Sequence, residues 1–301
     1  MTRSPLEHHG TARGKLLLAG TVLATLRKPA GGAGGLVVVV LIGAAILAPL
    51  LTPYDPLQSS VKDILKQPSA QNWLGTDNFG RDVFSRIIFG ARISLLVSLS
   101  AVALSCVFGI TTGLASGYWG KKVDTILQRG MDSIMSIPVI VLTMTVVAML
   151  GTSTANVIVA IGLSFMPSVS RIVRGSTLAT KENQYTEAAR AIGASDVRII
   201  VLHILPNVMS PIIVVATIMM GQAILIEATL SFLGVGVQPP TPSWGGMLSI
   251  EGRQFMLRAP WIAVFPGLAI SLVIFGFNLL GDALRDVLDP RLRGTGYLKG
   301  P

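Results

Sequence analysis

Long uncharged stretches alternate along this chain with shorter segments that carry most of its charged residues. A helix needs about 20 mainly apolar residues to cross the roughly 30 Å of hydrocarbon in a membrane. By this measure the pattern predicts six spanning helices, over residues 35–52, 93–116, 133–150, 155–170, 207–232 and 260–281. A tight turn at Gly151-Thr152-Ser153-Thr154-Ala155-Asn156 is expected to separate the third helix from the fourth. We therefore expect an all-α, polytopic membrane protein.

The composition is typical of an integral membrane protein, because 51% of the residues are hydrophobic and only 13% are charged. Soluble domains carry about 25% charged residues. The net charge of +9 does not indicate a nucleic-acid partner, since the basic residues are spread over the segments between spans. The single cysteine, Cys106, lies in an apolar run. We expect no disulfide, no metal site and no cofactor.

One transmembrane domain is expected between two tails, with bounds at residues 1–34, 35–293 and 294–301. In the first tail, residues 16–26 are apolar but too few to span the membrane, and basic residues flank them. They predict an interfacial helix. A signal peptide is the alternative, although Arg27 and Lys28 stand where a small-residue cleavage site would be needed.

The distribution of basic residues predicts which side of the membrane each segment faces. Cytoplasmic segments are enriched in Lys and Arg. The segments 1–34, 117–132, 171–206 and 282–301 hold 17 of these residues, whereas the segments 53–92 and 233–259 hold 7. Both termini are therefore expected in the cytoplasm.

Known catalytic patterns are missing from the sequence. It contains no Gly-x-x-x-x-Gly-Lys-[Ser/Thr] phosphate-binding loop, no His-Glu-x-x-His pair and no Gly-x-Ser-x-Gly elbow. The chain is therefore not expected to be an enzyme or to bind ATP itself, and a membrane enzyme is disfavoured.

Glu227 is the one acidic residue inside a predicted span. Carboxylates at such positions are costly and often functional. It is a candidate for lining or gating a translocation pathway, and an ion-coupled secondary carrier would depend on it. The alternative is that it bonds a neighbouring helix or reaches lipid headgroups near the outer end of its span.

Small residues mark one face of the second span. Gly109, Gly113 and Gly117 follow one another at intervals of four. This spacing places them on a single helical face, where a second helix can approach closely. We expect a helix contact there.

The cytoplasmic segment 185–206 predicts two short helices. Thr186 to Ile192 favours helix because of its alanines. Gly193 suits a left-handed helix end, and Ser195 or Asp196 can cap a second helix. Pro206 is expected to redirect the chain before the fifth span. The pair either projects as a docking element or lies on the membrane as an amphipathic pair.

This segment resembles a known family. Glu187-Ala188-Ala189, Gly193 and Leu205-Pro206 are similar to the coupling loop of permease subunits of bacterial ABC importers. The resemblance implies the type I importer fold and a coupling role for these residues, which would enter a groove on a partner ATPase. His203 stands where the family pattern prefers an apolar residue, so no role is assigned to it. The implied partners are a homologous second permease, two cytoplasmic ATPases and an external substrate-binding protein.

Further motifs narrow the resemblance to the subfamily that imports dipeptides and oligopeptides and, in some members, nickel, and to its C-type subunit. The resemblance covers about residues 30–293 and implies a bacterial inner-membrane permease for short peptides, with nickel or glutathione as alternative cargo. The motifs are Trp73-Leu74-Gly75-Thr76-Asp77, Gly80-Arg81-Asp82, Gly90-Ala91-Arg92-Ile93-Ser94-Leu95, Ser231-Phe232-Leu233-Gly234, Gln238 to Gly245, and Asn278 to Pro290.

The outer motifs also have a physical interpretation. Asp82 can cap a helix, and the apolar positions that follow it predict a helix lying along the outer membrane surface. The Pro-rich turn before Trp244 predicts a stiff loop with an aromatic anchor at the interface. Asp77, Arg81, Asp82 and Trp244 are therefore candidates for docking the binding protein. Lipid anchoring alone is the alternative.

Overall fold

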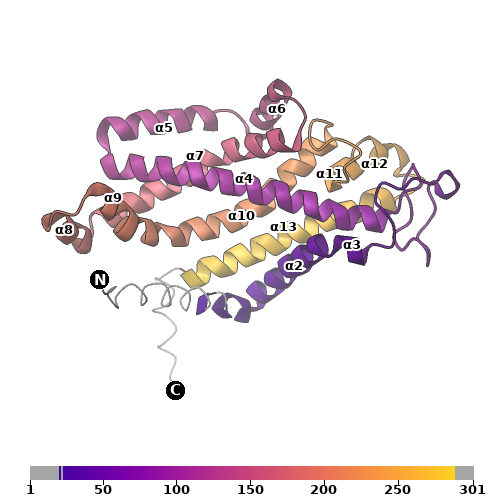
Figure 1. Ribbon diagram of the computed structural model, residues 1–301, viewed down its shortest axis with the longest axis horizontal. Coiled ribbons are helices and arrows are strands. Elements are labelled where there is room, and N and C mark those ends of the chain that lie inside the picture. Colours follow the sequence, from indigo (N-terminus) through magenta and orange to yellow (C-terminus); the bar gives the residue numbers. More distant parts are fainter. Residues whose placement is uncertain (1–19, 22, 289–301) are drawn as a thin grey trace, which may run out of the picture.

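The computed structural model describes residues 20, 21 and 23–288, which form an elongated bundle of helices (Figure 1). Within these residues no strand forms, and one isolated antiparallel bridge joins Thr76 to Asp82. The short element η1 is a 3-10 turn and η2 is a π-helical turn. The elements are α2 (Pro29–Ile46), α3 (Ala48–Leu51), η1 (Val61–Asp63), α4 (Val83–Trp119), α5 (Lys121–Met135), α6 (Val139–Leu150), α7 (Thr154–Lys181), α8 (Gln184–Ala191), α9 (Asp196–Ile199), η2 (Ile200–Ile204), α10 (Leu205–Phe232), α11 (Trp244–Leu248), α12 (Ile250–Phe255) and α13 (Trp261–Leu288).

Five helices are long and apolar enough to cross a membrane: α2, α4, α7, the continuous run from α9 to α10, and α13. The helices α5 and α6 make a sixth crossing if the bent pair counts as one span. The all-α, multi-spanning fold predicted from the hydrophobic pattern is confirmed.

The predicted third span over 133–150 is not one helix. Its first residues belong to α5, and α6 follows at an angle of 90°. Pro138 explains the break, because proline lacks a backbone N–H and disfavours helical geometry in the residue before it. The predicted turn after this span is present: α6 ends at Leu150 and is followed by Gly151, and Ser153 caps α7 by accepting from the Asn156 amide at 3.2 Å.

The fourth span extends to Lys181, eleven residues beyond the predicted end. The sequence prediction stopped at the first charge, Arg171. In the structure Arg171 pairs with Asp132 of α5 at 2.6 Å, and the next basic residue of α7, Arg174, pairs with Asp124 at 2.6 Å. These pairs let the helix continue through a charged stretch.

The first, second and sixth spans also differ from their predicted bounds. The helix α2 begins at Pro29, a residue favoured in the first helical turn, and breaks near Leu47 before α3. The helix α4 begins at Val83, so the predicted surface helix after Asp82 is wrong: those residues are the first turns of α4. The helix α13 runs on to Leu288, past the predicted end at 281.

The helices α4 and α7 pack along the predicted small-residue face. A Cβ atom on Gly109 would lie 2.6 Å from Val169 Cβ, and one on Gly113 would lie 2.6 Å from the Ser170 carbonyl oxygen. Such distances leave no room for a side chain. The expected close contact is confirmed, and its partner is α7.

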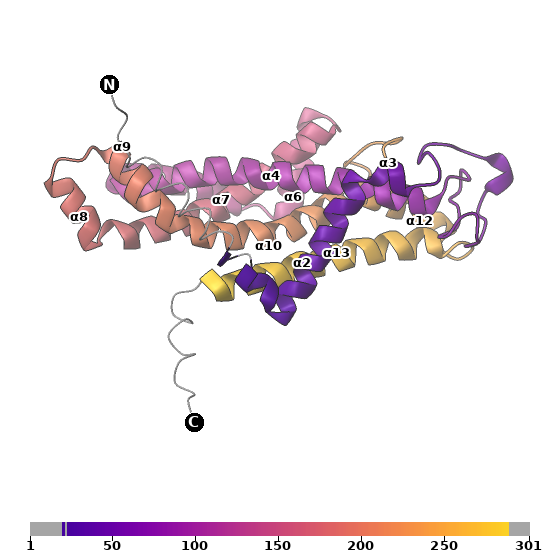
Figure 2. The same cartoon turned by 60° about the horizontal axis from the view of Figure 1, so that its bottom comes forward.

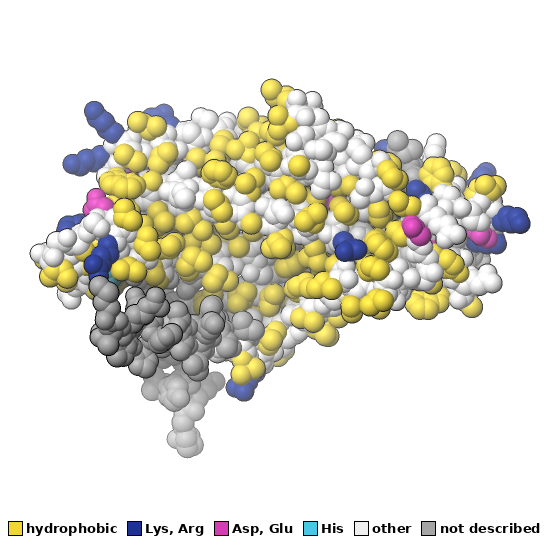
Figure 3. All heavy atoms as spheres, viewed as in Figure 1, with side chains coloured by type: hydrophobic (Ala, Val, Ile, Leu, Met, Phe, Trp, Pro, Cys, Tyr) yellow, Lys and Arg dark blue, Asp and Glu magenta, His cyan; other side chains and the backbone are white. Residues whose placement is uncertain are grey.

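The two ends of the bundle differ in structure. The helices α8 and α9 lie at one end, and the loop of residues 52–82 with α11 and α12 lies at the other (Figures 1 and 2). Charged side chains gather near these ends, and the middle of the visible face is mainly hydrophobic (Figure 3). Lys28, before α2, pairs with Asp286 of α13 at 3.1 Å, which brings the two ends of the described chain together.

The two terminal tails fall largely outside the described residues. Of the predicted interfacial helix over 16–26, residues 20, 21 and 23–26 are described, and they are helical. The predicted tail of residues 294–301 lies outside the described residues.

Candidate functional site

The first candidate site is the coupling pair, defined as α8, α9 and the residues between them. The helix α8 ends at Ala191, and Gly193 follows with a φ of +82°, the left-handed conformation expected for it. Ser195 occupies the predicted cap position before α9 but makes no capping hydrogen bond through its side chain. The pair forms where the sequence predicted it.

The surface of the coupling pair is partly apolar. Glu187, Ala188 and Gly193 are exposed, as a docking role requires. Ile192 and Val197 are 86% and 68% exposed. Exposed apolar groups of this kind, gathered on a projecting element, are typical of protein-binding surfaces. Sequence reasoning missed both residues, because neither belongs to the family motif.

Three predicted coupling residues are placed differently. Ala189 is buried against the bundle, and Leu205 is half-buried and packs on the same hydrophobic core. Pro206 does not redirect the chain, because α9, η2 and α10 run as one continuous 37-residue helix. The Leu205 amide bonds the Ile200 carbonyl, five residues back. This π turn adapts the helix to the N–H that proline lacks.

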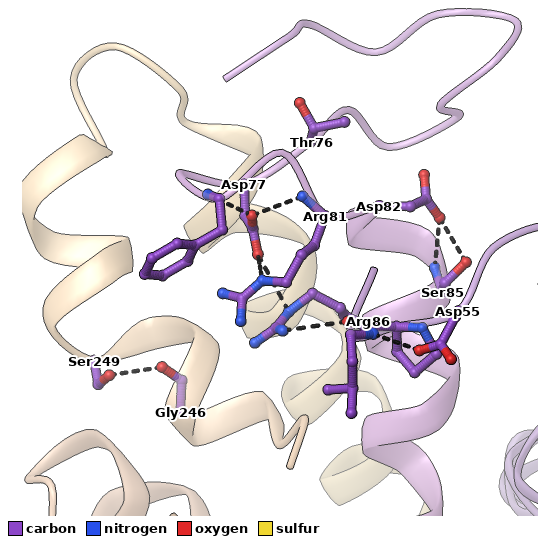
Figure 4. Close-up of polar contacts among 12 residues, drawn as sticks. Asp55, Thr76, Asp77, Arg81, Asp82, Ser85, Arg86, Gly246 and Ser249 are labelled. Carbon is purple, nitrogen blue, oxygen red and sulfur yellow. Dashed lines mark hydrogen bonds and ion pairs between the residues drawn. The ribbon is translucent and has the colours of Figure 1, made fainter. Parts of the chain in front are cut away.

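The second candidate site is the loop at the opposite end. Asp77 is 1% exposed and lies at its centre (Figure 4). One carboxylate oxygen accepts from the Phe79 and Arg81 amides at 2.8 and 2.9 Å. The other accepts from Arg81 Nε at 2.7 Å and lies 3.4 Å from Arg86 Nε. The carboxylate therefore fixes the loop before α4 from within.

Asp82 and Trp244 complete this site. Asp82 caps α4 by accepting from the Ser85 amide and hydroxyl, both at 2.8 Å, as predicted (Figure 4). Trp244 is 2% exposed, and its indole N–H donates to the Ile87 carbonyl at 2.9 Å. The expected aromatic anchor in the interface is therefore wrong. Trp244 packs against Gly90 of α4, where a Cβ atom would lie 2.9 Å from the ring.

Glu227 is fully buried between α10 and α4. Its carboxylate accepts from the Ser94 hydroxyl at 3.2 Å and from the Ser231 hydroxyl at 2.8 Å. Ser231 in turn accepts from the Val237 amide at 3.0 Å. Of the two interpretations of Glu227, this geometry matches the bond to a neighbouring helix, because the side chain has no surface exposed in this subunit.

The described residues contain no cluster of three or more His, Cys, Asp or Glu side chains able to hold a metal ion. A groove of about 470 Å³ is lined by apolar side chains of α2, α4, α10 and α13, together with Arg92. The two candidate surfaces, the coupling pair and the loop of residues 52–82, lie at opposite ends of the helical bundle (Figures 1 and 2).

Comparisons with known proteins agree with this arrangement. Residues 109–294 match the family described as the inner membrane component of binding-protein-dependent transport systems. Residues 23–68 match the N-terminal transmembrane domain of oligopeptide transport permease C.

Two curated relatives cover most of the chain. The dipeptide transport system permease protein DppC of Alkalihalophilus pseudofirmus is 45% identical over 260 residues, which cover 86% of this chain and 85% of the relative. The glutathione transport system permease protein GsiD of Pectobacterium atrosepticum is 45% identical and covers 89% of each chain.

A solved structure supports the fold. The crystal structure of an amino acid ABC transporter with histidines matches with a TM-score of 0.50 at 15% identity, covering 67% of this chain and 94% of that one. The chain belongs to the family of inner-membrane permease components of binding-protein-dependent ABC importers.

Proposed function

We propose that this chain forms half of the translocation pathway of an importer for short peptides. A homologous second permease subunit would supply the other half, and two cytoplasmic ATPase subunits would supply the energy. The observation that carries the proposal is the coupling pair, which presents Ile192 and Val197 beyond the membrane-length helices. The permease itself is proposed to be non-catalytic.

The same arrangement supports an orientation. The coupling pair and both ends of the described chain lie toward one end of the bundle (Figure 1), and the segments assigned to that side hold 17 of the 24 Lys and Arg residues. We infer that both termini are cytoplasmic. The single transmembrane domain over 35–293 is retained as a proposal, with α2 starting slightly earlier, at Pro29.

The cargo proposal rests on relatives of two kinds. One is named for dipeptide transport and the other for glutathione transport, and glutathione is itself a small peptide. We propose a short peptide as the cargo, with glutathione as the alternative within this class. Uptake of a labelled dipeptide, competed with unlabelled dipeptide or glutathione, distinguishes the two.

The outer loop is proposed to dock the substrate-binding protein. Asp77, Arg81 and Asp82 are buried, so they would act by holding the loop in shape. Trp73 and Phe79 are 59% and 48% exposed on the same loop and would supply the contacting surface. Trp244 would support this loop region from within, by holding α11 against α4.

A pair of substitutions tests the proposed ATPase contact. Ile192→Asp with Val197→Asp places two charges on the apolar surface, and we expect the ATPases to stop co-purifying with a permease that still inserts and folds. Val61→Asp is the matched control, because Val61 lies on the outer loop and its exposure of 86% equals that of Ile192. Normal co-purification of the double variant would refute the proposed contact.

A further inference from the structure

The cytoplasmic end of α4 forms a junction with three other helices. Tyr118, the residue before the last of α4, is 5% exposed. Its hydroxyl donates to the carboxylate of Asp196, the first residue of α9, at 2.6 Å. A hydrogen bond to an ionised acceptor at this distance is among the stronger kinds in proteins. The coupling pair is thus tied to α4 by a side chain that the family motif does not include.

Tyr118 also meets α7 and α8. Its backbone carbonyl accepts from Lys181 Nζ, on the last residue of α7, at 2.7 Å. The guanidinium carbon of Arg190, in α8, lies 6.0 Å from the centre of the Tyr118 ring, and Lys181 Nζ lies 5.7 Å from it. These distances are at the outer range of cation–π attraction. One aromatic residue therefore contacts α7, α8 and α9 together.

The same end of α4 is held to α5. Ser116 donates to Asp124 of α5 at 2.5 Å. Asp124 also accepts two hydrogen bonds, each 2.6 Å long, from the guanidinium of Arg174 in α7. Two parallel bonds of this kind fix orientation as well as distance. The end of α4 is therefore bonded to α5, and the same carboxylate of α5 is bonded to α7.

A second hydrogen bond of the coupling pair is local. Thr186 of α8 donates to the Thr180 carbonyl of α7 at 3.1 Å, across the corner where one helix leads into the next. The helix α9 continues through η2 into α10. Among the described residues, the side-chain hydrogen bond that joins α9 to a different helix is the one from Tyr118 to Asp196.

We propose that Tyr118 is a positioning residue that transmits ATPase-driven movement of the coupling pair to α4, through Asp196, and from there to α5 and α7. This inference rests on the proposed function. Without the hydroxyl, the pair can still bind the ATPases, because Tyr118 is buried and Ile192 and Val197 remain in place. Its movement would still reach α10, into which α9 continues, but would no longer pass to α4 through this hydrogen bond.

The test uses the whole transporter, reconstituted in liposomes with its partner permease, ATPases and binding protein. In Tyr118→Phe we expect normal co-purification of all subunits but at least about a tenfold rise in ATP hydrolysed per substrate imported, as loss of a charge-assisted hydrogen bond suggests. Asp196→Ala should raise the same ratio of ATP hydrolysed to substrate imported, and the double variant should raise it no further than either single one. Asp196→Asn keeps an acceptor and should restore coupling.

Controls separate this inference from its alternatives. Tyr54→Phe removes a hydroxyl from a 39% exposed tyrosine on the outer side and should leave the ratio unchanged. A wild-type ratio in both Tyr118→Phe and Asp196→Ala would overturn the inference, and so would loss of ATPase co-purification in a folded Tyr118→Phe chain. If the wild-type complex shows no ATP-driven uptake, the proposed function fails instead.

Discussion

Replacing Gly113 with alanine should weaken the contact between α4 and α7. The new Cβ atom would lie 2.6 Å from the Ser170 carbonyl oxygen and 2.7 Å from Val173 Cβ. Ordinary carbon contacts lie at about 3.5–4.0 Å, so the two helices must separate by several tenths of an ångström or more. Ser170 and Val173 both belong to α7. The Ser170 carbonyl oxygen is part of the helix backbone and cannot rotate away as a side chain could.

The cost follows from this geometry. Overpacking of a well-packed interior typically destabilises by about 1–3 kcal/mol. We expect the upper part of this range, because separating the helices also weakens the adjoining contacts at Gly109 and Gly117. Gly175→Ala is the matched control: it lies in α7 itself, but a Cβ atom there meets nothing within 4 Å.

The assay is thermal unfolding of the purified permease in detergent, followed by the loss of monodisperse protein. Gly113→Ala should unfold at a lower temperature than wild type, and Gly175→Ala should not. Equal unfolding temperatures for the two variants would refute the inferred close packing of α4 on α7.

Three further predictions concern the buried polar groups. Asp77→Asn should destabilise the outer loop by about 3–5 kcal/mol, because breaking a buried ion pair leaves its basic partners buried without a counter-charge. Limited proteolysis of that loop measures the effect, with the exposed Asp55→Asn as the control. Equal cleavage of the two variants would contradict the prediction. Glu227→Gln should keep transport within about twofold, since an amide still pairs with both serines; abolished uptake would instead assign Glu227 a proton-coupling role. Glu227→Leu should lower stability by about 1–3 kcal/mol for each hydroxyl left unpaired, seen as a lower unfolding temperature.

Hydrophobic runs were sufficient to predict the class of fold and the approximate place of each span, because lipid imposes a length on every apolar helix. Helix ends were less predictable. The helix α7 passes through Arg171 and Arg174 because acids of α5, about 40 to 50 residues away in the sequence, compensate them. Periodicity within one segment contains no information about such distant partners.

Local chemistry predicted the helix ends in the coupling pair and at the start of α4 correctly. Gly193 adopts the left-handed conformation, and Asp82 caps α4, because both effects depend on only a few neighbouring residues. The orientation of Trp244 was predicted wrongly because its burial depends on the space left by Gly90, more than 150 residues earlier. Ala189 and Leu205 belong to the family motif, but their packing against the bundle is a property of the folded chain alone.

The central claim is that an ATPase partner drives uptake through this permease. The direct measurement is uptake of a labelled dipeptide into liposomes that contain the complete transporter, with ATP supplied to the ATPase side. We predict uptake that requires ATP and the binding protein, and that continues when a protonophore removes the proton gradient. Uptake that persists without ATP and collapses with the proton gradient would contradict the account.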